Sequence, residues 1–264
     1  MTLFRDPWWR DLKDYYGTPA SVALDLGTRY KGRRPVFPPS KTCPDPPRGQ
    51  TLDEIWASKP RNTPEAKEQF WRDVGPWFSF RQCVRNRARS FRFIAETEPM
   101  TFLEWGAGVC PVAHWLLTRV KNPPMAIVVA DVQSEHFRFG VWRVRRAEAG
   151  SAGSYVRKVV LSHQAPMPLG AVRFYAAAVL ETLEHVPNPL ETIRHLGEHL
   201  LPGGFLFEDF RSHGPGDEGA PWDLPEAQAE RPEVYHYLEK AFDLVAGRHY
   251  NELDGGGTRS WRKR

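Results

Sequence analysis

The stretch from Thr101 to Leu117, TFLEWGAGVCPVAHWLL, constrains the fold more than any other part of the sequence. An apolar run ends on the acid Glu104, turns through Gly106 and Gly108, and enters an apolar segment with helical spacing. A strand, a glycine turn and a helix in this order present a helix N-terminus to a nucleotide-like ligand, because glycine has no Cβ to keep the backbone away. Alone, this pattern also occurs in folds that bind nothing at the turn.

The chain after Thr101 alternates strands and helices. We expect strands at 101–105, 126–130, 155–161, 173–179 and 204–209, and helices over about 135–149, 189–200 and 233–241. The segment 211–232 between the last strand and helix is expected to be loop-rich. Two closing strands, 242–250 and 258–262, flank a glycine-rich turn and predict a hairpin. The sequence therefore predicts an α/β fold: a Rossmann-like, seven-stranded, mostly parallel sheet with a C-terminal antiparallel hairpin.

The N-terminal third has a different character. A Trp- and Tyr-rich helix is expected from about Pro7 to Tyr16, and residues 32–50 are too rich in proline for regular structure. Helix starts follow at Thr51 and Thr63, and a basic, aromatic stretch then continues to Thr97. We interpret residues 1–97 as a helical, proline-rich cap that closes over the ligand of a second domain, residues 98–264.

Composition narrows the classes of function. A chain of 264 residues can bury one full core and carry an extension, and it contains no apolar run long enough to cross a membrane. The three cysteines lie far apart, which favours reduced thiols in a cytoplasmic protein. Residues 1–100 hold 18 Lys and Arg against 12 Asp and Glu. A solvated surface explains this excess better than an anionic partner does, although both interpretations stay open. The oligomeric state is left open.

Three features, in this order and spacing, carry a resemblance to a known family. They are Glu104-x-Gly106-x-Gly108, the acid Asp131 at the end of the second strand, and VLETLEHVPNPLETIRHLGEHLLPGG at 179–204, with a Leu-Pro-Gly-Gly turn before strand five. Over about residues 70–262 the chain resembles the class I S-adenosylmethionine-dependent methyltransferases. The resemblance implies S-adenosyl-L-methionine as cofactor.

The resemblance also implies particular contacts. Asp131, about 20 residues after the glycine turn, would accept both ribose hydroxyls, with a helix cap as the alternative role. Glu104 and Gly106 would face the methionine half. The full set expected at the cofactor is Glu104, Trp105, Gly106, Ala107, Gly108, Asp131, Val132, Ser162, His163 and Val179, of which Ser162 and His163 would lie near adenine. Two positions depart from the family pattern: Cys110 replaces a third glycine, and Tyr175 replaces an aspartate.

The sequence Glu181-x-x-Glu184-His185 follows strand four, where the reactive methyl group would lie. On one helical turn these three side chains would share a face and could chelate a divalent metal. The stretch is similar to one in ubiquinone-pathway O-methyltransferases and to one in RNA terminal 2′-O-methyltransferases. In the RNA enzymes this stretch binds a metal, and a further histidine completes the site. In this chain His213 or, as a second candidate, His236 could supply that histidine. The metal-free alternative makes His185 the general base, with His213 and Glu181 as second choices.

These features predict an enzyme that transfers a methyl group from S-adenosylmethionine to a hydroxyl or amine of a small molecule. One alternative is RNA methylation of the terminal 2′-O type. It is disfavoured because the arginines are scattered and no RNA-binding module is recognisable. The other alternative is a methyltransferase-like protein that binds cofactor or a partner without catalysis, which Cys110 and Tyr175 would permit.

Overall fold

The computed structural model describes residues 10–11, 14–15, 63, 65–66, 93–151, 153–161, 169–211, 223–249 and 257–264. The proline-rich stretch 32–50 and most of the predicted cap, residues 1–97, lie outside these residues. The proposed division after residue 97 stays a prediction, and Ile94, just before it, is fully buried in the core of the following domain. Within the described residues, no helix combines the length and apolar character needed to cross a membrane.

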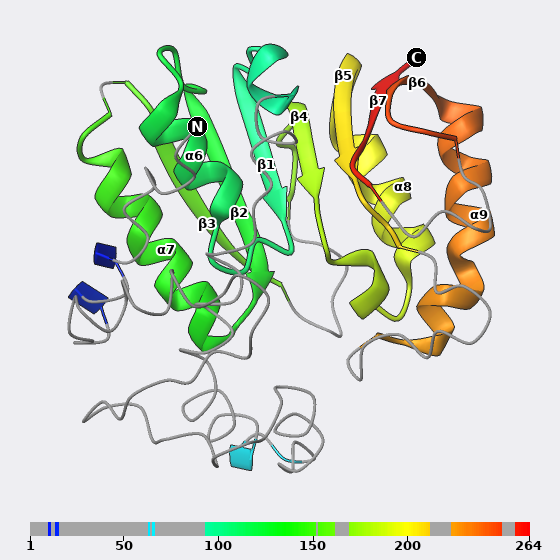
Figure 1. Cartoon of the computed structure of the whole chain (residues 1–264), viewed down its shortest axis with the longest axis horizontal. Coiled ribbons are helices and arrows are strands. Elements are labelled where there is room, and N and C mark those ends of the chain that lie inside the picture. Colours follow the sequence, from blue (N-terminus) through cyan, green and yellow to red (C-terminus); the bar gives the residue numbers. More distant parts are fainter. Residues whose placement is uncertain are drawn as a thin grey trace, which may run out of the picture.

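Seven strands form one sheet in the order β3-β2-β1-β4-β5-β7-β6 (Figure 1). Their bounds are β1 Thr101–Trp105, β2 Ala126–Val132, β3 Tyr155–Leu161, β4 Phe174–Val179, β5 Leu200–Glu208, β6 Phe242–Ala246 and β7 Arg259–Lys263. The first five strands are parallel, whereas β7 runs antiparallel to both β5 and β6. This architecture confirms the predicted fold class, including the antiparallel C-terminal pair.

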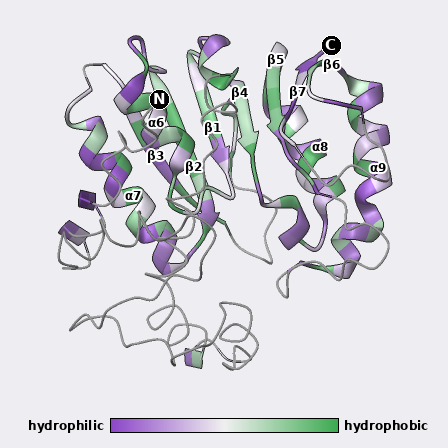
Figure 2. Ribbon diagram, in the orientation of Figure 1, coloured by the Kyte–Doolittle hydropathy of each residue, from purple (hydrophilic) through white to green (hydrophobic). Residues whose placement is uncertain are grey.

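Helices cover both faces of the sheet, and each face has its own hydrophobic core (Figure 1). The helices are α6 Pro111–Arg119, α7 Glu135–Glu148, α8 Pro189–His199 and α9 Pro225–Ala241, with a short 3₁₀ helix η1 at Leu183–His185. Successive residues of β1 point to opposite faces, so Phe102 joins the core under α6 and α7 while Leu103 joins the core under α8 and α9. The central strands are accordingly apolar along most of their length (Figure 2).

Two predicted boundaries are wrong. Strand β5 begins at Leu200, so the Leu-Pro-Gly-Gly stretch is not a turn before the strand but part of it. The glycines allow this: the pairing register with β4 shifts between Phe174 and Ala176, and Gly203 takes a φ of +73°. Helix α9 begins at Pro225, inside the segment expected to be a loop, because its first half buries Ala227 and Arg231 and can start on a proline.

Candidate active site

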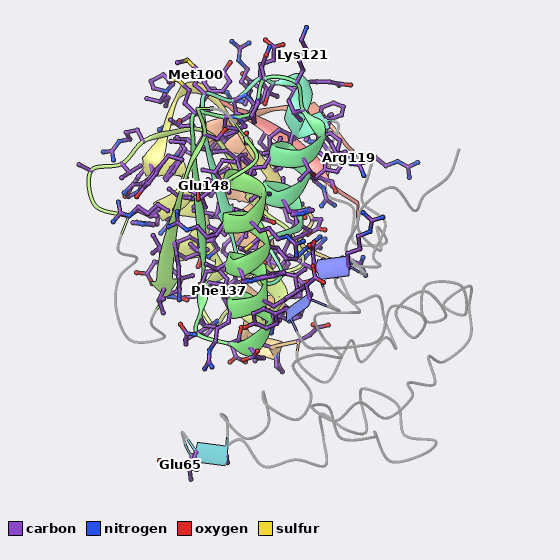
Figure 3. The ribbon with its side chains drawn as sticks, turned by 90° about the vertical axis from the view of Figure 1, so that its left-hand side faces the viewer. Glu65, Met100, Arg119, Lys121, Phe137 and Glu148 are labelled. Carbon is purple, nitrogen blue, oxygen red and sulfur yellow. The ribbon has the colours of Figure 1, made fainter. Side chains whose placement is uncertain are left out.

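The sheet reverses its strand order between β1 and β4, since β2 and β3 lie to one side and β5 to the other. In open α/β sheets a ligand binds beyond the carboxyl ends of the strands at such a point. Three segments meet this edge: Gly106–Cys110 after β1, Asp131–Val132 at the end of β2, and Leu180–His185 after β4. Phe137 in the first turn of α7 lies toward this end of the domain, and Met100 and Lys121 lie at the opposite end (Figure 3).

The loop after β1 alternates through left-handed backbone, with φ of +65° at Gly106, +49° at Gly108 and +52° at Cys110. The Ala107 amide donates a hydrogen bond to the Ala130 carbonyl at 3.1 Å, and the Cys110 amide donates one to the Ala107 carbonyl at 2.6 Å. A Cβ on Gly106 would lie 2.2 Å from the side chain of Thr182. Cys110, which replaces the third glycine of the family pattern, also adopts the left-handed conformation, and this costs a cysteine about 1–2 kcal/mol.

Glu104 is buried, and its carboxylate accepts hydrogen bonds from the amides of Val112 at 3.0 Å and Ala113 at 2.8 Å. These amides belong to the first turn of α6, whose unsatisfied N–H groups attract an acid. Burial raises the pKa of Glu104 to about 8, and the two backbone hydrogen bonds oppose that shift. Glu104 thus fixes the helix to the end of β1. Its contact with the methionine half of a cofactor stays a prediction.

Asp131 lies at the carboxyl end of β2 and accepts hydrogen bonds from the amides of Gly108 and Val132, both at 2.6 Å. Burial raises the pKa of Asp131 to about 6, against the effect of these two amides and of the nearby His185. Ser134 caps α7 by accepting a hydrogen bond from the Phe137 amide at 3.2 Å, so the helix-cap role considered for Asp131 is wrong. Each carboxylate oxygen keeps a second lone pair that can accept a hydrogen bond from a further donor. The two hydroxyls of a ribose could be these donors.

Glu181, Glu184 and His185 do not share one helical face, so that prediction is wrong. Glu181 has a left-handed φ of +51° and precedes η1 rather than lying in a helix. Its amide donates to Asp209 at 2.5 Å, and its carboxylate lies 2.6 Å from the guanidinium of Arg211. Within the ranges that the structure describes, no three His, Cys, Asp or Glu side chains are grouped to hold a metal ion.

His185 forms a pair with an acid that the sequence did not single out. Its Nδ1 lies 3.1 Å from Oδ1 of Asp223, and its Nε2 lies 4.0 Å from Oε1 of Glu184. The imidazole is one-third exposed, whereas the Asp223 side chain is 9% exposed. A proton on Nδ1 directed at Asp223 leaves Nε2 as the basic nitrogen. The arrangement is an oriented imidazole beside the point where the strand order reverses between β1 and β4.

The other predicted residues have different positions. The side chains of Trp105, Ala107 and Val179 are buried in the two cores, Val132 is half-buried at the end of β2, and His236 is exposed on α9. Ser162, His163 and His213 lie outside the described residues. Tyr175 is the second residue of β4 and packs on Phe205, so this departure from the family pattern falls at the opposite end of the strand from the site.

Sequence reasoning missed Asp209, Arg211 and Asp223. Asp209 and Arg211 follow β5, and an acid at a strand's carboxyl end is the same signal that identified Asp131. Asp223 stands two residues before α9 and gave no such signal, because the start of that helix was predicted too late. A correct helix start would have placed an acid near η1, since the Leu224 amide donates to the Glu184 carbonyl at 2.8 Å.

No protein-family model matches the sequence, and no curated protein matches it significantly. Solved structures do. An O-methyltransferase family protein from Burkholderia thailandensis is 13% identical, with a TM-score of 0.55 over 81% of this chain and 67% of that one. The N-methyltransferase NodS from Bradyrhizobium japonicum, in complex with S-adenosyl-L-homocysteine, is 15% identical, with a TM-score of 0.50 over 77% of this chain and 99% of that one.

The N-terminal domain of EvdMO1 with S-adenosylhomocysteine bound is 17% identical, with a TM-score of 0.51 over 70% of this chain and 84% of that one. The chain shares the fold of these methyltransferases. At such identities the likeness concerns the fold, and the chemistry has to be argued from the residues at the carboxyl edge of the sheet.

Proposed function

We propose that the protein is an S-adenosylmethionine-dependent methyltransferase that acts on a hydroxyl or amine of a small molecule. The observation that carries this proposal is the grouping at one switch point of a left-handed glycine loop, the strand-end acid Asp131 and the His185–Asp223 pair. The likeness to methyltransferases solved with S-adenosylhomocysteine supports the same cofactor.

The residues present fit that cofactor. Gly106 and Gly108 bring bare backbone to the edge where a nucleoside would lie, and Asp131 offers a carboxylate there for two hydroxyl donors. When bound, S-adenosylmethionine supplies a methyl group on a positively charged sulfur. The chain's part is then to position the acceptor, exclude water and remove a proton.

His185 is the proposed general base. Asp223 holds the imidazole through Nδ1, and Nε2 can take the proton of an acceptor hydroxyl as the acceptor attacks the methyl carbon. The His185–Asp223 pair resembles other His–Asp pairs, in which the carboxylate fixes the tautomer of the imidazole and stabilises the imidazolium. An amine acceptor that is already deprotonated needs less from this pair.

The test uses radiolabelled methyl transfer from S-adenosylmethionine to a panel of phenols, catechols, amines and sugars. With an accepted hydroxyl substrate, His185→Ala should lower turnover at least about tenfold with little change in cofactor binding. Asp223→Asn should lower it by a smaller factor. His236→Ala, an exposed histidine on α9, is the matched control and should leave turnover unchanged. Unchanged turnover in His185→Ala would remove the base from the mechanism.

The same assay decides the role of a metal. Glu184 and His185 are adjacent, but Glu181 is paired with Arg211, so a metal here would need donors from residues outside the described ranges, such as His213. We expect turnover to survive a chelator. Loss of turnover that Mg²⁺ or Mn²⁺ restores would replace the base mechanism by metal activation of the acceptor.

A further inference from the structure

The described residues near the N-terminus pack on α7. Residues 10, 11, 14 and 15 are helical, as predicted for 7–16, and the two blue segments lie beside α7 in Figure 1. Asp11, Asp14 and Tyr15 are spaced i, i+3 and i+4 and thus share one face. Tyr15 donates a hydrogen bond to Glu135 at 3.3 Å and packs on the rings of Phe139 and Trp142.

Two acids on this face make ion pairs of opposite character. Asp14 pairs with Arg146 at 2.5 Å, and both side chains are about half exposed. Asp11 pairs with Arg143 at 3.0 Å, and these side chains are 8% and 1% exposed. An exposed pair contributes little, whereas breaking a buried pair leaves an uncompensated charge. The chain therefore offers a buried contact and an exposed one in the same helix–helix interface.

Arg143 reaches from this buried pair to the loop after β1. Its Nη1 donates to the Val109 carbonyl at 3.5 Å, and its Nη2 lies 3.3 Å from Nδ1 of His114 in the first turns of α6. His114 Nε2 lies 3.6 Å from Asp11, which closes the network. The described helical residues 10, 11, 14 and 15 are called the N-terminal segment below. The Arg143 guanidinium thus joins this segment, the loop after β1 and α6 at one buried point.

The backbone of α7 also touches this loop directly. A Cβ on Gly140 would lie 2.4 Å from the Gly108 carbonyl and 2.8 Å from the Val109 Cα. Gly108 donates its amide to Asp131, the proposed ribose ligand. A shift of Arg143 or of α7 would therefore change the loop that holds Asp131, because no side chain at position 140 can absorb the movement.

We propose that Asp11 is a positioning residue for the cofactor loop, and that docking of the N-terminal segment on α7 is thermodynamically coupled to cofactor binding. Asp11 neutralises and orients Arg143, and Arg143 holds the Val109 carbonyl and α6 in the arrangement that Asp131 and Gly108 require. The inference rests on the proposed function for the identity of the ligand. Coupling of this kind is reciprocal: the docked segment raises affinity for the cofactor, and bound cofactor holds the segment in place.

The test compares Asp11→Asn with Asp14→Asn in the full chain, by calorimetric titration with S-adenosylhomocysteine. Asp11→Asn should raise Kd at least about fivefold, the lower end of typical coupling, and Asp14→Asn should change it less than about twofold. The second readout is tryptic cleavage near Arg10, which is exposed. S-adenosylhomocysteine should slow this cleavage in the wild type and in Asp14→Asn, and much less in Asp11→Asn.

Equal Kd values for the wild type and Asp11→Asn, with equal protection from trypsin, would overturn the inference while leaving the proposed function intact. A wild type that binds no S-adenosylhomocysteine would contradict the proposed function itself. Should Asp11→Asn fail to fold, Arg143→Lys keeps the charge that Asp11 needs but lacks the planar fork that also reaches Val109 and His114. It should raise Kd in the same way, and an unchanged Kd would contradict the coupling.

Discussion

At the scale of single residues, the site depends on backbone conformations that ordinary side chains resist. Gly106 has a left-handed φ of +65° and lies directly against Thr182, while Cys110 tolerates a φ of +52° with its side chain fully buried. Thr182 immediately precedes η1, which carries His185. The close approach of Gly106 to Thr182 therefore sets the distance between the proposed cofactor loop and the proposed base.

Gly106→Ala should destabilise the fold by about 1–3 kcal/mol and abolish detectable binding of S-adenosylhomocysteine, because the new Cβ overlaps Thr182 and the φ is unfavourable. Urea unfolding and calorimetry measure the two effects. The double variant Gly106→Ala with Thr182→Gly removes the overlap and should recover part of both losses. No loss in the single variant would mean that the loop is not packed against Thr182.

As the proposed ribose ligand, Asp131 should give the affinity for the cofactor a pH dependence. Its carboxylate has to be deprotonated to accept two ribose hydroxyls, and burial raises its pKa to about 6. Affinity should thus be nearly constant above pH 7 and fall as pH drops through 6 toward 5, by at most about tenfold per unit. Calorimetry at several pH values measures this. Asp131→Asn should bind weakly at every pH, and the same slope in that variant would assign the titration to another group.

At the scale of elements, β7 lies between β5 and β6 and brings a charge into the core. Glu208 of β5 is fully buried and lies 3.6 Å from the guanidinium of Arg259. It also accepts hydrogen bonds from the Trp261 indole at 3.0 Å and from the Phe210 amide at 2.7 Å. The antiparallel end of the sheet is therefore held by a buried polar cluster as well as by strand pairing.

Arg259→Met should lower the free energy of unfolding by about 3–5 kcal/mol, since it leaves the buried Glu208 carboxylate without its cation. Arg262→Met is the matched control in the same strand, where the side chain is exposed, and should change the free energy of unfolding by less than about 0.5 kcal/mol. Urea unfolding of the two variants measures the difference. Equal stability would mean that the Trp261 and Phe210 donors suffice for Glu208.

At the scale of the whole molecule, local pattern predicted the sheet and the acids at its strand ends, but not the contacts between distant segments at the site. Alternating strands and helices gave the bounds of β1 and β3 and the pairing of β6 with β7, because those elements follow from hydrophobic periodicity and turn residues. The acids at strand ends were predictable for the same reason, since an apolar run that stops on an acid places that acid at the edge of the sheet.

What the sequence could not give depends on contacts between distant segments. The helical face expected for Glu181, Glu184 and His185 failed because Asp209 and Arg211, which follow another strand, hold Glu181 in a left-handed conformation. The role of Asp223 depends on where α9 starts, and burial of Ala227 and Arg231 decides that start. Spacing along the chain contains neither contact.

The central claim is that the carboxyl edge beside β1 and β2 binds S-adenosylmethionine. Calorimetric titration of the full chain with S-adenosylhomocysteine, in parallel with Asp131→Ala, tests it most directly. We predict one site per chain in the wild type and a Kd at least about tenfold higher in the variant, as expected for loss of two hydrogen bonds to a charged group. Absence of binding in the wild type, or equal Kd values in both proteins, would contradict it.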